Sequence, residues 1–165
     1  MLFNLQEGLD STLLILKHRL KASEYRPEIK VVCEYENLPE IQCFPGLLNQ
    51  VFMNLIANGI DALDESNKGK TFEEIAANPN RITIQTQLTS ESIIISIGDN
   101  GKGMSEDVRN RIFEQGFTTK GVGKGTGLGL AIARQIIEEK HQGTLSCHSK
   151  LGQGTTFLIK IPLQA

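Results

Sequence analysis

The sequence predicts a two-layer α/β sandwich, in which a mixed, mostly antiparallel sheet of about five strands carries about three helices on one face. Two observations support this prediction. Segments with apolar residues at helical spacing alternate with short apolar runs of strand length, and the strand candidates Arg81–Leu88 and Ser92–Gly98 are separated by a tight connection typical of a hairpin. A chain of 165 residues suits a single domain, which we expect to cover residues 1–165.

Three elements are expected before residue 64. Leu5–Leu20 is expected to be a helix because its leucines recur at helical spacing and its end is basic. A strand is expected around Ile29–Tyr35. Pro45 opens the next expected helix, at a position where its missing N–H costs nothing, and this helix runs to about Leu63. Asp64–Asn80 is a polar insertion with room for one short turn of helix, and the sequence assigns it no role.

The remainder of the chain is expected to complete the sheet and the helical layer. The expected elements are the hairpin strands 81–88 and 92–98, a short helix at 106–113, a helix at 127–141, and strands at 144–149 and 155–161. The helix at 127–141 is expected to end before Gly143, because Lys140 and His141 occupy its last turn and a glycine commonly follows a helix.

Charge and cysteine content exclude several classes of protein. The net charge is −2 and no basic cluster is present, so we expect neither nucleic-acid binding nor direct contact with a membrane surface. The three cysteines, Cys33, Cys43 and Cys147, lack metal-ligand spacing, and we expect a reducing cytoplasmic compartment. No signal peptide or membrane span is visible in the sequence, so a membrane anchor of a longer parent protein would lie outside this chain.

The helix that begins at Pro45 carries a narrow polar stripe opposite its apolar face. At 100° per residue, Gln50, Asn54, Asn58 and Asp61 fall on this stripe. A solvated helix face is the simplest explanation for one asparagine, but two asparagines four residues apart beside an aspartate indicate a polar wall that lines a cleft. Neutral oxygen ligands of this kind suit Mg²⁺, which completes its shell with water and nucleotide phosphates.

The segment GFTTKGVGKGTGLGL, residues 116–130, is rich in glycine and runs directly into a predicted helix. A flexible linker would not lead into an amphipathic helix in this way. Glycines let the backbone approach a ligand closely, and the N–H groups at the start of a helix bind anions, so the segment indicates a phosphate cradle under a mobile lid. Its spacing fits neither a Walker loop, since Gly125 follows Lys124, nor the dinucleotide-binding pattern, since Leu130 stands at its third glycine.

Four segments occur in a characteristic order: NQVFMNLIANGIDAL, DNGKGM, IFEQGFTTK and GTGLGLAI, followed by GQGTTFLIKIP. They resemble the N, G1, F and G2 boxes of the ATP-binding catalytic domain of sensor histidine kinases, also called the CA or HATPase_c domain. That domain belongs to the GHKL superfamily and has the Bergerat fold. The boxes span Asn49–Ile132, and with the flanking elements the resemblance covers nearly the whole chain.

The resemblance implies ATP and Mg²⁺ as cofactors and assigns roles to individual residues. Asp99 is expected to accept a hydrogen bond from the exocyclic amine of adenine. Asn58 is similar to the Mg²⁺ ligand of the family, and Asn54 on the same wall and Lys120 at the terminal phosphates are the expected catalytic residues. The other expected nucleotide-binding residues are Gly101, Gly103 and Met104 of the second box, Phe113, Phe117, Thr118 and Thr119 of the third, Gly125, Thr126, Gly127, Leu128, Gly129 and Leu130 of the fourth, and Thr155 near the adenine.

The resemblance also implies what the glycines and phenylalanines of these boxes do. Gly101 and Gly103 are expected to let the nucleotide lie against the backbone. The two phenylalanines, Phe113 and Phe117, are expected to anchor the lid, and the glycines of the fourth box to form its hinge and the phosphate cradle. Two departures from the family are visible. Gln115–Gly116 replaces the usual Pro-Phe, so lid closure is expected to be looser, and Asp61 stands where many kinases carry a phosphate-binding lysine, a charge that Lys120 is expected to supply.

The resemblance implies transfer of the γ-phosphate to a histidine on a separate dimerisation domain, which this chain lacks, with a response regulator downstream. Hydrolytic members of the superfamily carry a glutamate general base one turn before the Mg²⁺ asparagine, where this chain has Asn54, which cannot take a proton. None of the three histidines, His18, His141 and His148, fits the phosphoacceptor signature. Two alternatives stay open: a hydrolytic ATPase switch, and a nucleotide-binding module without transfer. Anti-sigma serine kinases share the fold and differ in the accepting residue.

Overall fold

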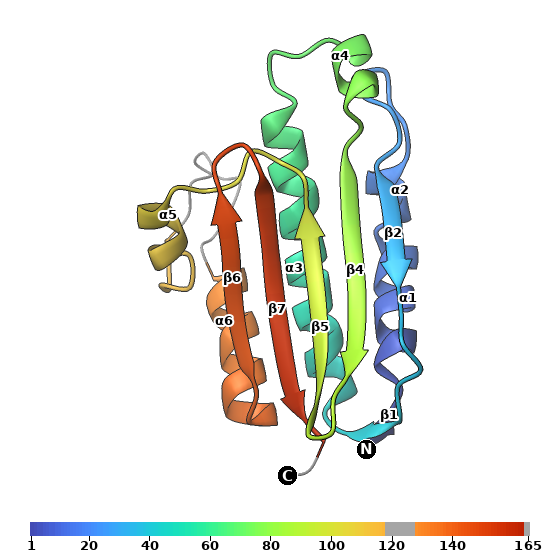
Figure 1. The fold of residues 1–165 in the computed structure, drawn as a ribbon, viewed down its shortest axis with the longest axis vertical. Coiled ribbons are helices and arrows are strands. Elements are labelled where there is room, and N and C mark those ends of the chain that lie inside the picture. The colour runs from blue at the N-terminus through green and yellow to red at the C-terminus, as the bar shows by residue number, and fades with distance from the viewer. Residues whose placement is uncertain (118–127, 164–165) are drawn as a thin grey trace.

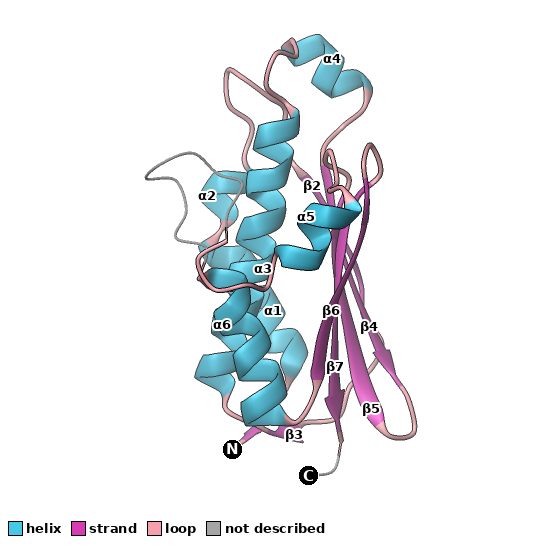
Figure 2. Cartoon of the chain, turned by 90° about the vertical axis from the view of Figure 1, so that its left-hand side faces the viewer, coloured by secondary structure: helices cyan, strands magenta, loops and turns pink. Residues whose placement is uncertain are grey.

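The computed structural model describes residues 1–117 and 128–163. Its main feature is a five-stranded sheet with helices on one face, seen face-on in Figure 1 and edge-on in Figure 2. In spatial order the strands are β2 (Lys30–Glu34), β4 (Arg81–Leu88), β5 (Ser92–Asp99), β7 (Gly154–Pro162) and β6 (Thr144–Lys150). The predicted two-layer sandwich is confirmed.

The sheet is mixed, as predicted. The pairs β4–β5, β5–β7 and β6–β7 are antiparallel, whereas β2 runs parallel to β4. The parallel pair follows from connectivity, because the chain crosses from one strand to the other through a long helix. Alternate isoleucines of β5, Ile93, Ile95 and Ile97, are buried against the helices, so the strand keeps the period of two expected for a sheet with one covered face.

The helical layer consists of α1 (Leu5–Ile15), α3 (Pro45–Ser66) and α6 (Gly129–Gln135), which continues into a π-helical turn, η1 (Ile136–Lys140). Helix α3 lies between α1 and α6 (Figure 1). It begins at Pro45, as predicted, and its apolar face, which includes the fully buried Phe52, Leu55 and Ile56, packs on the sheet. Within the described residues, none of the helices combines the length and apolar character needed to span a membrane.

The predicted single helix over residues 5–20 is wrong in one respect, because α1 ends at Ile15 and a short helix, α2 (Lys17–Leu20), follows. A helix cannot bury four consecutive apolar residues on one face, and this segment contains such a run of four, Leu13–Leu16. The break leaves Leu14 and Ile15 exposed while Leu16 and Leu20 are buried. It also turns α2 toward the end of α3.

The polar insertion after residue 63 is more helical than the sequence indicates. Helix α3 extends to Ser66, and α4 (Phe72–Ala77) follows, with a capping box in which Thr71 and Glu74 satisfy each other's backbone N–H groups. Two reciprocal amide hydrogen bonds of 2.7 and 3.2 Å join Asn67 to Asn80 and close the segment where the chain enters β4. The insertion therefore serves as an ordered return from α3 to the sheet.

Three further short elements complete the described chain. Strands β1 (Leu2–Phe3) and β3 (Ile41–Gln42) form a separate antiparallel pair, and α5 (Glu106–Arg111) starts at Ser105, whose hydroxyl accepts from Val108 N at 3.3 Å. The β1–β3 pair was not predicted, because strands of two residues are too short to show periodicity.

Candidate functional site

The candidate site lies where the carboxyl end of β5 meets α3. Figure 1 shows β5 running up to this end beside α3, with the chain then turning toward α5. Asp99 is the last residue of β5, and its carboxylate lies next to α3 at Gly59. The structure thereby brings together the first and second of the boxes predicted from the sequence.

Asp99 is both a turn residue and a candidate acceptor. Its Oδ1 accepts from Gly101 N at 2.8 Å, which is the local turn that Asp-Asn-Gly favours. The side chain is partly buried, and this burial raises its pKa from 3.8 to about 6, against the opposing effect of the backbone N–H groups of Gly101 and Thr155. Its Oδ2 lies toward Gly59, so the carboxylate presents an acceptor to the space beneath α3.

The glycines after Asp99 are needed by the protein's own packing. Gly103 has φ +72°, and a Cβ there would come within 2.0 Å of the carbonyl oxygen of Lys150. A Cβ on Gly101 would lie 2.9 Å from Asp99 Oδ1 and 3.2 Å from Ala62 O. The sequence analysis expected these glycines to make room for the nucleotide, whereas the structure fills the space before Gly103 with protein backbone. Their contact with a nucleotide stays a prediction.

A hydroxyl pair on the sheet holds the loop that follows Asp99. Ser149 and Thr155 face each other across β6 and β7, with their hydroxyl oxygens 2.8 Å apart. Ser149 Oγ also accepts from Met104 N at 2.8 Å and donates to Gly154 O at 3.0 Å. Thr155 is buried beside Asp99, its expected place near the adenine stays a prediction, and Ser149 is a candidate site residue that the sequence analysis missed. Only the register of the two strands reveals it.

The polar stripe of α3 connects to the start of α6. Asn54 Nδ2 donates to the carbonyl oxygen of Gly129 at 3.1 Å, so the amide ties α3 to the first residue of α6. Asn58 and Asp61 are partly buried, whereas Gln50, at the other end of the stripe, is exposed. Three of the four stripe residues therefore lie in a partly enclosed wall, and the amide oxygen of Asn58 is one that could hold a cation.

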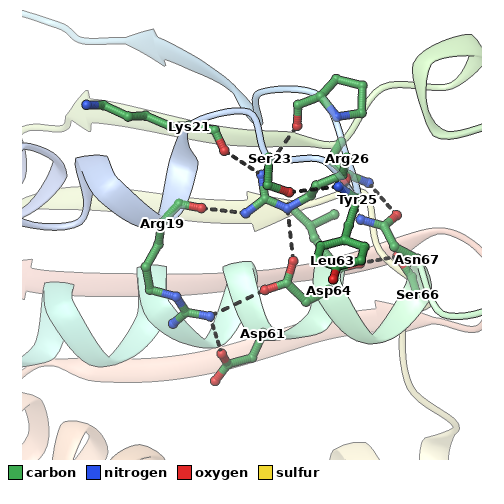
Figure 3. Close-up of polar contacts among 12 residues, drawn as sticks. Arg19, Lys21, Ser23, Tyr25, Arg26, Asp61, Leu63, Asp64, Ser66 and Asn67 are labelled. Atoms are coloured by element: carbon green, nitrogen blue, oxygen red, sulfur yellow. Dashed lines mark hydrogen bonds and ion pairs between the residues drawn. The ribbon is translucent and has the colours of Figure 1, made fainter. Parts of the chain in front are cut away.

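Asp61 forms an ion pair with a residue outside the predicted boxes. Arg19 of α2 contacts Asp61 at 2.7 Å and Asp64 at 3.5 Å, and Arg26 contacts Asp64 at 3.0 Å (Figure 3). These contacts join the start of the chain to α3 across about forty residues of sequence. The sequence analysis assigned the basic residues near Arg19 only to the end of a helix, and no local pattern marks them as part of the site.

The two phenylalanines of the third box anchor the segment after α5. Phe113 packs edge-to-face on Phe157 of β7, with ring centroids 6.4 Å apart, and the Arg134 guanidinium lies 4.9 Å from the centre of its ring. Phe117 is covered by Arg111, whose Cζ is 4.6 Å from the ring centroid. Phe113 thus holds this segment against the sheet and α6, whereas Phe117 is held by α5, and their role as anchors of a lid stays a prediction.

Other predicted residues are less fully described. Leu130 and Met104 are partly buried against the core, and Leu128 caps α6 through its backbone. The predictions for Thr118, Thr119, Lys120, Gly125, Thr126 and Gly127 lie outside the described residues. In residues 1–117 and 128–163, no three His, Cys, Asp or Glu side chains are grouped so that they could hold a metal ion.

Comparison with known proteins assigns the chain to a family. The family described as histidine kinase-, DNA gyrase B- and HSP90-like ATPase matches residues 45–165. The chain belongs to this ATPase family. Within the family it is similar to sporulation kinase E of Bacillus subtilis (strain 168), with 38% identity over 129 residues, and to the sensor histidine kinase ZraS of Escherichia coli (strain K12), with 36% identity over 128 residues.

Solved structures agree with this assignment. The catalytic domain of the histidine kinase ThkA superposes with a TM-score of 0.78 at 26% identity, and the match covers 99% of this chain and 97% of that domain. ThkA has also been solved in complex with the response regulator protein TrrA, a match at 21% identity and a TM-score of 0.73 that covers 99% of this chain and 42% of that one. The predicted resemblance to the ATP-binding catalytic domain of sensor histidine kinases is confirmed.

The ATPase domain corresponds to a small part of its relatives. The matches cover 78% of this chain but only 15% of sporulation kinase E and 24% of ZraS. The comparisons therefore identify an ATP-binding catalytic domain, which corresponds to part of these longer kinases.

Proposed function

We propose that this domain binds Mg-ATP and donates the γ-phosphate to a histidine on the dimerisation domain of the same protein. The observation that carries the proposal is the position of Asp99, a partly buried acceptor beneath α3, beside a wall that has an amide, Asn54, where hydrolytic members carry a glutamate base. This arrangement suits a site that holds ATP for an outside nucleophile. The family assignment supports ATP as the ligand.

Recognition of adenine is assigned to Asp99. The backbone N–H of Gly101 fixes Oδ1, and the ionised carboxylate keeps acceptor capacity for the exocyclic amine of adenine. Guanine carries an oxygen at the equivalent position, and a carboxylate cannot donate to it. The buried setting increases the discrimination, because a polar group left unpaired there costs about 1–3 kcal/mol.

Magnesium is assigned to the amide oxygen of Asn58. Mg²⁺ is commonly bound by one or two protein oxygens together with substrate phosphates and water, and the donor set of the α3 wall fits this pattern. When bound, the ion would neutralise charge on the phosphates. Asn54 is assigned a different role, because its Nδ2 donates to the carbonyl of Gly129 and positions the start of α6.

Transfer is favoured over hydrolysis by the chemistry of residue 54. A general base must take a proton from water, and the amide of Asn54 cannot do so. The phosphate acceptor is expected on another domain, because none of the three histidines fits the phosphoacceptor signature. His141 is in addition buried with both ring nitrogens in hydrogen bonds, Nε2 with Phe44 N at 3.1 Å and Nδ1 with Ile136 O at 3.0 Å. The complex of ThkA with TrrA supports a response regulator as the downstream partner, and we place the domain in the cytoplasm.

The proposal is tested by following label from γ-³²P-ATP. The chain is mixed with Mg²⁺ and with the dimerisation domain of its parent protein, and an Asp99→Asn variant serves as the control for a working site. Acid-labile, alkali-stable label on the dimerisation domain is expected. Label recovered only as free phosphate would instead indicate a hydrolytic switch, and label that stays on bound ATP would indicate a binding module without transfer.

A further inference from the structure

Arg19 uses only part of its guanidinium in the ion pairs of Figure 3. Both contacts, to Asp61 Oδ1 at 2.7 Å and to Asp64 Oδ2 at 3.5 Å, are made by the same nitrogen, Nη2. Among the residues that the structure describes, Nε and Nη1 have no hydrogen-bond acceptor, and the side chain is 32% exposed. Arg19 is therefore held through Nη2, and its Nε and Nη1 donors have no partner among the described residues.

Arg26, the neighbouring arginine, shows the opposite pattern. Its Nε donates to Asp64 at 3.0 Å, its Nη1 donates to the carbonyls of Lys21 and Pro27 at 3.1 and 3.3 Å, and its Nη2 donates to the carbonyl of Arg19. Its side chain is only 11% exposed. Arg26 is thus a structural tether between α2 and α3, and it engages the backbone carbonyl of Arg19 but not its side chain.

The guanidinium of Arg19 meets the wall assigned to the cation and phosphates at Asp61. Asp61 follows Asn58 by three residues, so the two side chains are neighbours on one face of α3. Phosphates that share a Mg²⁺ ion with Asn58 would lie close to the Asp61 carboxylate, which by itself repels them. Arg19 neutralises this carboxylate, and a guanidinium offers donors in the fork geometry that suits phosphate oxygens.

We propose that Arg19 is a phosphate-binding residue of the nucleotide site, which Asp61 positions through Nη2 and which contacts the terminal phosphates through Nε and Nη1. The inference rests on the proposed function and extends it, since it places a cation from α2, outside the four boxes, at the phosphate end of the site. It supplies charge at the position where Asp61 replaces a basic residue of the family.

The test compares the affinities of ATP, ADP and AMP by titration calorimetry with Mg²⁺ present. Arg19→Gln is expected to weaken ATP and ADP by about tenfold, which corresponds to 1.4 kcal/mol, and to change AMP binding less than twofold. Lys21→Gln is the matched control, because it removes one positive charge from an exposed site at the end of the same helix. It is expected to leave all three affinities unchanged. Arg19→Lys keeps the charge but lacks the forked donor geometry of a guanidinium, and is expected to lower ATP affinity by an intermediate amount.

Three outcomes would overturn the inference: Arg19→Gln binds ATP like the parent, it loses ATP and AMP affinity equally, or Lys21→Gln has the same effect. If Arg19→Gln does not fold, Arg19→Lys decides the question, because it can keep the ion pair with Asp61 and should still lower the preference for ATP over AMP. If the parent chain fails to bind Mg-ATP, the proposed function itself is refuted. If the parent chain binds Mg-ATP and Arg19→Gln binds it equally well, only this inference is refuted.

Discussion

Gly59 of α3 packs directly over the carboxylate of Asp99 at the end of β5. A Cβ at Gly59 would lie 3.7 Å from Asp99 Cβ and 3.8 Å from its Oδ2, which is ordinary van der Waals contact. The helix therefore closes over the carboxylate without a side chain between them. Residue 59 sets how much room the acceptor of the nucleotide site has.

This contact predicts opposite effects for a small and a large residue at position 59. Gly59→Ala is expected to raise the free energy of unfolding by about 0.5–1 kcal/mol, because alanine favours the helix and its Cβ fits, and to leave ATP affinity unchanged. Gly59→Leu is expected to press on Asp99 and to lower ATP affinity by more than about tenfold. Urea unfolding and calorimetry measure both. A destabilised Gly59→Ala variant would show that the space over Asp99 is smaller than the structure indicates.

The raised pKa of Asp99 predicts a pH dependence of folding. Burial raises this pKa from 3.8 to about 6, so between these values the folded state binds a proton that the unfolded state has lost. The free energy of unfolding is therefore expected to fall as pH rises from 4 to 6, by on the order of 2 kcal/mol from this group. Asp99→Asn should lack this contribution. Urea unfolding of both proteins across the range measures the difference, and identical pH profiles would contradict it.

The same group predicts a pH dependence of nucleotide binding. The ionised carboxylate accepts the adenine amine, whereas protonation occupies one of its oxygens, so ATP affinity is expected to rise as pH rises through about 6. The nucleotide phosphates also titrate near this pH, and adenosine, which lacks them, is the control ligand for calorimetry. Adenosine affinity that is constant from pH 5 to 7 would exclude Asp99 as the acceptor.

The sequence predicted those parts of the molecule that depend on local pattern. The start of the helix at Pro45 and the β4–β5 hairpin follow from periodicity and turn residues, and the structure places them as expected, with β5 one residue longer than predicted. Ser149 could not be predicted, because its role comes from the register of β6 on β7. Arg19 could not be predicted either, since its partner Asp61 is 42 residues away and α2 reaches it only through a break in the helix.

Gly103 provides a test of how the loop after Asp99 is held. Its φ of +72° and the 2.0 Å approach of a Cβ to Lys150 O mean that Gly103→Ala must displace the backbone. We expect a loss of stability of about 3 kcal/mol or more, with weaker ATP binding, since strain and overpacking add. Gly152→Ala is the matched control, with φ +81° and open space around its Cβ, and should cost only about 1–2 kcal/mol. Equal losses in thermal or urea unfolding would show that the clash with Lys150 is relieved cheaply.

Two substitutions of Asn54 separate the loss of its hydrogen bond to Gly129 from the replacement of its donor by an acceptor. Asn54→Ala removes the bond to Gly129 O and should cost about 1 kcal/mol of stability. Asn54→Asp keeps the shape but turns an oxygen toward that carbonyl, and is expected to cost more and to weaken ATP binding further, because the start of α6 is pushed away. Calorimetry and urea unfolding rank the two variants. If Asn54→Asp were as stable as the parent, the amide would not be donating to α6.

His141 is expected to be a structural residue and not a phosphate acceptor. A backbone N–H can only donate, so Nε2 must accept from Phe44 and Nδ1–H donates to Ile136 O, which fixes a neutral tautomer inside the protein. The Phe44 ring packs edge-on against the imidazole at 5.6 Å. His141→Ala removes both hydrogen bonds, one of them buried, together with the packing of a buried ring, and is expected to cost about 2–3 kcal/mol, measured by urea unfolding. His148→Ala, on an exposed position of β6, should change stability by less than about 0.5 kcal/mol.

Both variants should still transfer phosphate to the dimerisation domain, and a His141→Ala variant that is stable but fails to transfer would assign His141 to the chemistry instead.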